Sequence, residues 1–194
     1  MINLITKTNT LLISLNDMKL YLRITNSIED TLIENLIRQA QNVIENYTSR
    51  AITINTYEYI YDSLNTTEYY PVDRIQIYKG KITSIDSIKT YNLAGTETIK
   101  TLTDFDYINF NQYSYIATKD GSDFPIGDRS YSPLKIEFKA GYDITTIPYD
   151  LKEAIYKLVA DYYEYRESTN SEYIKDISTG VINIINRWRI ELIP

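Results

Sequence analysis

Residues 14–50 carry the pattern that decides most of the fold, and they read SLNDMKLYLRITNSIEDTLIENLIRQAQNVIENYTSR. A capping box, Ser14 followed by Asp17, predicts a short helix through about Leu22. A second one, Ser27 followed by Asp30, predicts the start of a long helix with acidic residues in its first turn. Apolar residues then recur in steps of three and four. This stripe predicts an amphipathic helix of about five turns, with these residues on its buried face: Ile28, Leu32, Ile33, Leu36, Ile37, Ala40, Val43, Ile44 and Tyr47.

A second helical pattern follows about a hundred residues later, over 147–167. Pro148 stands where a helix can begin, because the missing N–H costs nothing in the first turn. The stripe of this helix comprises Leu151, Ala154, Ile155, Leu158, Val159 and Tyr162. Each stripe needs a partner, so we expect the two long helices to pack on each other.

Between the helices the period changes from helical to alternating. Ile52 to Tyr61 is β-branched or aromatic at alternate positions, which predicts a strand. Further strands are expected at 74–78, 82–91, 97–102, 106–116 and 134–139, with turn signals between them. The expected fold class is α+β: a helical bundle of two long and several shorter helices, with a β-rich antiparallel insertion between the long helices. We expect one domain over residues 1–194, with helical parts at 14–50 and 148–194 and the insertion at 52–140.

Composition excludes several function classes. The chain has 194 residues, no Cys, no His and a net charge of -6. The missing His removes the commonest general base and metal ligand, so a catalyst would have to work through carboxylates, Lys, Tyr or a metal held only by oxygens. The sequence also has no catalytic motif, so a hydrolase of that kind is the least favoured function, and we expect no enzyme and no cofactor. Acidic charge argues against unaided binding to nucleic acid. No apolar run is long enough to span a membrane, and the N-terminal residues make a poor signal peptide.

Several carboxylates near glycines are the best candidates for metal ligands in this sequence. They are Asp104, Asp106, Asp120, Asp123 and Asp128. The EF-hand order is missing and Asp is common in turns, so we expect turns rather than a bound cation.

Both helical segments resemble the head–tail connector (adaptor) proteins of tailed bacteriophages. The matching residues of the first segment are Leu15, Lys19, Leu22, Arg23, Ile24, Glu29, Asp30, Glu45, Tyr47, Thr48 and Arg50. Those of the second are Ala140, Gly141, Tyr142, Ile147, Pro148, Tyr163, Arg166 and Glu167. The resemblance implies a structural virion protein that forms a ring, commonly about twelve-fold, under the portal protein. It also implies contact with the next tail or connector protein, a channel through which DNA passes without sequence-specific binding, and residence in the virion after assembly in the host cytoplasm.

Contacts with a partner or a second subunit are expected at Arg23, Arg50, Ile184, Ile185, Arg187, Trp188 and Arg189. Trp and Arg dominate interface hot spots, and the last five resemble the closing segment of the family. The polar stretch Ser168 to Asp176 before them is expected to be a loop that acts as a hinge. Two readings of Trp188 stay open: an anchor on a partner, or part of the subunit's own core.

The alternative function is a binding module. Twenty Tyr residues supply apolar area with a polar tip. In this reading the β insertion recognises a protein or a glycan through Tyr57, Tyr59, Tyr61, Tyr69 and Tyr70.

Overall fold

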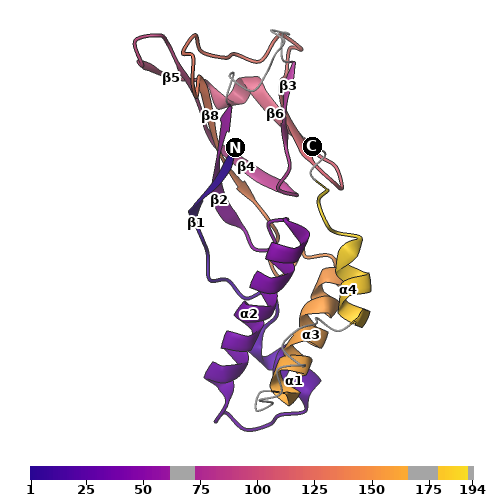
Figure 1. The fold of residues 1–194 in the computed structure, drawn as a ribbon. Helices are drawn as coiled ribbons and strands as arrows, with labels where there is room; N and C mark the ends of the chain where they lie inside the picture. Colours follow the sequence, from indigo (N-terminus) through magenta and orange to yellow (C-terminus); the bar gives the residue numbers. More distant parts are fainter. Residues whose placement is uncertain (62–72, 166–178, 192–194) are drawn as a thin grey trace. The chain divides into compact units, whose positions relative to one another are not determined.

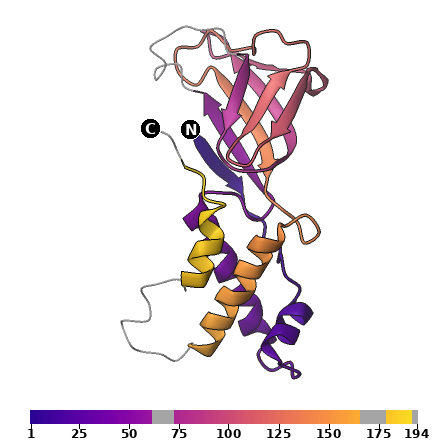
Figure 2. The ribbon, with the colours of Figure 1, turned by 90° about the vertical axis from the view of Figure 1, so that its right-hand side faces the viewer.

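The computed structural model describes residues 1–61, 73–165 and 179–191, and these residues combine helices with antiparallel sheets. They fall into two compact units, which we call the helical unit and the β unit (Figures 1 and 2). The helical unit takes Asn9–Thr53 and Tyr142–Glu191, and the β unit takes Met1–Thr8 and Ile54–Gly141. The expected single domain over 1–194 stays a prediction.

Four helices lie in the described part of the helical unit. They are α1 (Leu15–Leu22), α2 (Asp30–Thr48), α3 (Tyr149–Glu164) and α4 (Thr179–Asn186). Helix α2 packs against α3, as expected, and α3 packs against α4. The expected loop and hinge at Ser168 to Asp176 lie outside the described residues.

The first of the two expected capping boxes is confirmed at Ser14. The Ser14 side chain accepts a hydrogen bond of 3.0 Å from the Asp17 backbone N–H and so caps α1. The prediction at Ser27 was wrong. Helix α2 starts two residues later than that box requires, with Glu29 as a cap that makes no side-chain bond. Ile28 therefore precedes the first turn and is 89% exposed, so it does not belong to the buried stripe.

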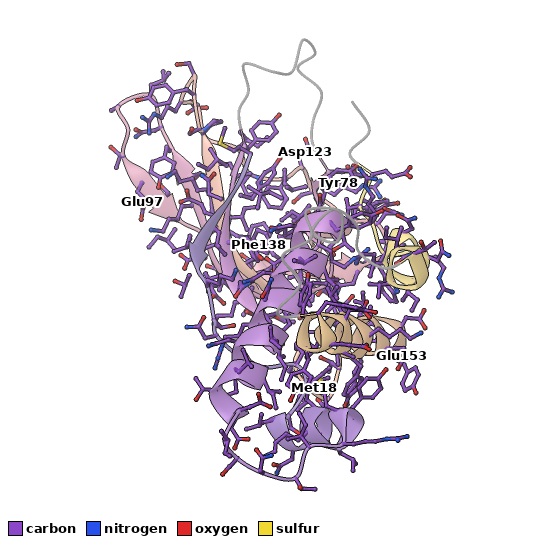
Figure 3. The ribbon with its side chains drawn as sticks, turned by 60° about the horizontal axis from the view of Figure 1, so that its bottom comes forward. Met18, Tyr78, Glu97, Asp123, Phe138 and Glu153 are labelled. Carbon is purple, nitrogen blue, oxygen red and sulfur yellow. The ribbon has the colours of Figure 1, made fainter. Side chains whose placement is uncertain are left out.

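The core of the helical unit follows the two stripes. Ile37 and Ala40 of α2 and Ile155 and Val159 of α3 are fully buried. A buried polar side chain secures the segment before α1: Gln41 accepts from the Leu12 backbone N–H at 2.8 Å and donates to the Thr10 carbonyl at 3.1 Å. Met18 is the buried residue of α1; Figure 3 labels it.

The β unit holds two antiparallel sheets. The five-stranded sheet has the order β1–β2–β8–β4–β5, and the three-stranded sheet has the order β3–β7–β6. The strands are β1 (Ile2–Thr6), β2 (Asn55–Tyr61), β3 (Arg74–Ile77), β4 (Ile82–Tyr91), β5 (Glu97–Ile99), β6 (Phe105–Asn109), β7 (Ser114–Thr118) and β8 (Leu134–Ala140), with a 3-10 turn η2 (Leu102–Asp104). Alternating side chains bury one side of β3 and of β8.

Two differences from the expected strands have physical causes. The apolar run expected at 106–116 is two strands, β6 and β7, joined by a tight turn in which the Phe110 N–H donates to the Tyr113 carbonyl. Strand β1 comes from the N-terminal residues, for which no strand was expected. The sheet is therefore not built from residues 52–140 alone, because β1 pairs with β2 along its edge.

Candidate interaction surfaces

The C-terminal segment of the helical unit docks on the end of α2. Past α4, the Ile190 backbone N–H donates to the Thr48 carbonyl at 2.8 Å. The Tyr47 hydroxyl donates to the Asn186 side chain at 2.6 Å. Arg189 lies 5.7 Å from the Tyr47 ring centroid. At the end of α2, the last carbonyl and the Tyr47 side chain are thus bound by residues 186–190.

Arg50 is the centre of this docking. Its side chain is among the largest fully buried ones, and the residue is 2% exposed. Its Nε donates to the Trp188 carbonyl at 3.0 Å, and its guanidinium lies 5.5 Å from the Trp188 ring centroid. Burial lowers the pKa of Arg50 below its ordinary value, and the neighbouring Tyr142 opposes that shift. The buried cation is stabilised by hydrogen bonds and by an aromatic face.

This arrangement accounts for the motif at the end of α2. Tyr47, Thr48 and Arg50 all bind the C-terminal segment. The sequence showed that the spacing of these residues resembles the family. It did not show that they bind the C-terminal segment. No local pattern connects residues more than a hundred positions apart, so only the fold shows that they meet.

Ile185 is fully buried in the helical core, while Ile184 and Trp188 are half-buried and pack against it. In this structure the segment therefore contributes to its own subunit. Ile185 and Arg50 would reach a partner only if the segment left that position. Their role in partner contacts, and that of Ile184 and Trp188, stays a prediction.

The other three candidate residues, Arg23, Arg187 and Arg189, are exposed. Arg187 is exposed and forms an ion pair of 3.1 Å with Asp150, and Arg189 is exposed beside Tyr47. Arg23 ends α1 in the left-handed conformation, with φ 59°. The structure brings Arg50, Ile184, Ile185, Trp188 and Arg189 to one end of the bundle. Partner contacts of Arg23, Arg187 and Arg189 stay predictions as well.

An aromatic cluster on the outer face of the three-stranded sheet was not anticipated. Tyr113 lies at its centre, with ring centroids 5.1 Å from Tyr115, 5.3 Å from Phe110 and 5.9 Å from Tyr78. Arg74 covers the Tyr115 ring at 5.0 Å. The members come from β7, from the turn before it and from the residue after β3. The sequence shows an alternating pattern within each strand segment. Only the strand order β3–β7–β6 shows that the aromatic residues of different segments meet.

Of the Tyr residues expected to form a recognition platform, the three described ones lie on β2. Tyr57 is 3% exposed and stacks on Phe138 with ring centroids 5.8 Å apart, so it belongs to the core of the sheet. Tyr59 and Tyr61 are half-buried on the same strand. Burial raises the pKa of Tyr59 above its ordinary value. Tyr69 and Tyr70 lie outside the described residues.

Among the carboxylates considered for a metal, Asp120 lies in a turn and Asp106 lies in β6. Asp120 accepts from the Ser122 backbone N–H at 3.0 Å and from its hydroxyl at 2.7 Å, and the backbone bond lowers the Asp120 pKa. Within residues 1–61, 73–165 and 179–191, no cluster of three or more acidic side chains could hold a metal ion. In the same part of the chain, no helix has the length and apolarity that crossing a membrane requires.

Solved structures with the same fold come from gene transfer agent (GTA) particles. One is from the neck of an empty GTA particle computed with C6 symmetry (21% identity, TM-score 0.73). Another is from the virion of a native GTA particle (20%, 0.74), and a third is from the neck of a native GTA particle computed with C12 symmetry (20%, 0.71). Each similarity covers 100% of this chain and 97% of the other.

Sequence comparison agrees with the fold. No curated protein sequence matches the chain. The sequence model of one family, described as phage gp6-like head-tail connector protein, matches residues 12–115. The match runs from α1 and α2 into β7, more than half of the chain, and includes the motif of Tyr47, Thr48 and Arg50 that holds the C-terminal segment. The chain belongs to the phage gp6-like head-tail connector protein family.

Proposed function

We propose that the chain is a structural protein of the virion that assembles into a ring under the portal protein and joins the DNA-filled head to the tail. The observation that carries this proposal is the family match over residues 12–115. The fold supports it, because proteins with the same fold over their whole length are parts of GTA particles and of their necks.

Ring assembly is supported by the symmetry of those particles. Two of the neck structures were computed with C6 and C12 symmetry. A ring of copies needs two different surfaces on each subunit that fit each other, because a heterologous contact closes only after a full turn. Exposed apolar residues are available on both units, including Tyr149 at 80% exposure and Ile108 at 58%.

DNA would pass through such a ring without sequence-specific binding. The chain carries a net charge of -6, and specific binding of DNA normally needs a cluster of Lys and Arg that neutralises phosphates. An acidic lining would keep DNA mobile in the channel. The protein would act in the virion, after assembly in the host cytoplasm.

A connector of this kind works by contact rather than by catalysis. The buried charged side chain of the helical unit, Arg50, holds the chain's own C-terminal segment. The Asp120 carboxylate holds a turn by accepting from the Ser122 backbone N–H. These roles are structural, which suits a protein whose task is to join other proteins.

The test is assembly of the full chain with and without the portal protein of the same phage. Native mass spectrometry and negative-stain electron microscopy would measure subunit number and shape. The expected result is a closed ring, about twelve-fold, that binds the portal at one end. A chain that stays monomeric at high concentration and does not bind the portal would overturn the proposal.

A further inference from the structure

The five-stranded sheet ends in two strands whose outer sides are unpaired among the described residues. Strand β1 lies at one edge and β5 at the other (Figure 1). Strand β1, Ile2–Thr6, contains no charged residue, and Leu4 and Ile5 are 48% and 51% exposed. Every residue of β5 is exposed, with Ile99 at 65%. Strand β5 carries one charged side chain, Glu97, which is paired with Lys89 of its own sheet at 3.1 Å. Open strand edges are templates for pairing with another strand.

The hydrogen bonds show which backbone groups of β1 face outward. Met1 and Ile60 exchange both of their backbone bonds, at 2.9 and 2.8 Å. In an antiparallel pair the bonded positions alternate, and the register pairs Ile2 with Tyr59 and Leu4 with Tyr57. Ile2 and Leu4 are therefore non-bonded positions, and their N–H and C=O groups point away from β2.

The same reasoning applies to β5. The Lys100 N–H donates to Ile88, and the Asn92 N–H donates to Thr96, so the bonded positions fall on even-numbered residues. Glu97 and Ile99 are the non-bonded positions, opposite Tyr91 and Lys89. Their N–H and C=O groups point away from β4. Figure 3 shows Glu97 at the outer margin of the sheet.

The pleat of the two edges determines how they can fit. On β1 the outward-facing backbone belongs to Leu4, which shares the core face of the sheet with Tyr57 and Phe138. On β5 it belongs to Ile99, which shares the opposite face with Lys89. In a parallel pair, a residue whose backbone faces its partner strand lies opposite one whose backbone faces away, with both side chains on one face. In such a parallel pair, Leu4 or Ile2 can therefore lie opposite Thr98. The core face of one sheet then continues as the core face of the next.

In an antiparallel contact between β1 and β5, the residues whose backbone groups bond across the contact would lie opposite each other. Leu4 would then pair with Ile99, and the core face of one sheet would continue as the outer face of the next. Every pairing within the five-stranded sheet is antiparallel, so β1 and β5 run in the same direction. Copies related by rotation about an axis near this direction would bring the two edges together in parallel. The two edges of one chain thus carry the two halves of a head-to-tail contact.

We propose that β1 of one copy adds in parallel to β5 of the next copy, so that the five-stranded sheets join into a continuous band. The occupant of each edge is a second copy of this chain. The inference rests on the proposed ring and names one of its contacts. Two strands this short bury little area, so the pairing sets the direction and alignment of a contact that must reach about 800 Å² per partner in total.

Chemical crosslinking tests the contact directly, because the chain has no Cys. The variants Asn3→Cys and Ile99→Cys place one thiol each on exposed edge positions that share the outer face. The full-length variants are mixed and treated with a short bis-maleimide, and linked peptides are identified by mass spectrometry. The expected product joins position 3 of one copy to position 99 of another, in the mixture only.

A second pair of variants tests the backbone bonds. Leu4→Pro removes an outward-facing N–H and leaves the bonds from β1 to β2 intact, while Leu4→Thr removes the same side chain but keeps the N–H. The proposal expects Leu4→Pro to weaken assembly at least 10-fold relative to Leu4→Thr, measured by native mass spectrometry across a concentration series. Equal assembly of the two folded variants would overturn it.

The outcomes separate this inference from the proposed function. A ring that forms without the 3-to-99 link overturns the edge contact and leaves the connector function standing. A link between two copies at position 3, in Asn3→Cys alone, means a two-fold β1 contact and also overturns it. Wild-type protein that forms no oligomer and does not bind the portal overturns both.

Discussion

In the helical unit, Ile33, Ile37 and Ile44 of α2 are fully buried, whereas in the β unit Ile99 and Ile108 are 65% and 58% exposed. The same residue type is thus placed differently in α2 and in the edge strands β5 and β6. A helix with one apolar stripe is satisfied once that stripe meets a second helix. A sheet has two faces and two edges, so apolar residues can remain at the surface after the core is complete. The edge strands β5 and β6 therefore keep apolar side chains available for contacts with other proteins.

The largest effect should come from a charge in the helical core. Ile37→Asp places a carboxylate at a site with no exposure, and we expect a loss of about 4 kcal/mol in the free energy of unfolding. Urea unfolding measures the loss, and hydrogen exchange should place it in α2 and α3. Ile28→Asp is the matched control, because Ile28 is 89% exposed and should change stability by less than about 0.5 kcal/mol. Similar values for the two variants would contradict the assignment of the buried stripe.

A close backbone approach should make one glycine of the β unit sensitive to substitution. A Cβ on Gly127 would lie 2.1 Å from the Tyr91 carbonyl oxygen and 2.8 Å from that of Pro133. Neither backbone atom can move freely, because the Tyr91 N–H donates to the Pro133 carbonyl at 2.9 Å. We expect Gly127→Ala to cost about 3 kcal/mol, measured by thermal unfolding.

Gly121→Ala is the control in the same loop. A Cβ there meets nothing within 4 Å, and the cost comes only from a φ of +74°. About 1 kcal/mol is expected from that strain. A larger effect at 121 than at 127 would mean that the loop does not pack on the end of β4 as described.

A smaller effect is expected where the C-terminal segment meets α2. Arg50→Met leaves the Trp188 carbonyl without its donor and should cost about 2 kcal/mol. Trp188 is the chain's only tryptophan, so its emission should shift to longer wavelength if the segment loosens. Arg187→Met, in an ion pair whose side chains are 66% and 44% exposed, should cost less than about 0.5 kcal/mol. Unchanged emission and stability in Arg50→Met would favour the reading in which this segment is free to anchor a partner.

The sequence predicts the helical unit better than the β unit, for a physical reason. The buried faces of α2 and α3 follow from a period of 3.6 within one segment, and only Ile28, at the helix start, was misplaced. Strand order depends on pairing between distant segments, which no local period encodes. The strand β1, the cluster around Tyr113 and the docking of Trp188 on Arg50 all needed the fold.

The smallest effect concerns acid stability of the turn before α3. Asp143 accepts from the Thr145 hydroxyl at 2.6 Å and from the backbone N–H groups of Thr145 and Thr146 at 2.8 Å each. These bonds favour the charged carboxylate and lower the Asp143 pKa from 3.8 to about 2. The group therefore contributes stability above pH 3.8, and this contribution is lost as pH falls from 3.8 toward 2.

In Asp143→Asn the side chain no longer titrates, so stability should fall less between pH 4 and pH 2 than in the wild type. Thermal unfolding at several pH values across this window would measure the difference. Asp123→Asn makes the same change of charge at an exposed position of the β unit and serves as the control for net charge. If both variants lost the same share of the acid dependence, the effect would come from net charge rather than from this turn. If only Asp143→Asn loses part of the acid dependence, the hydrogen bonds of Asp143 before α3 account for part of the stability that the helical unit loses in acid.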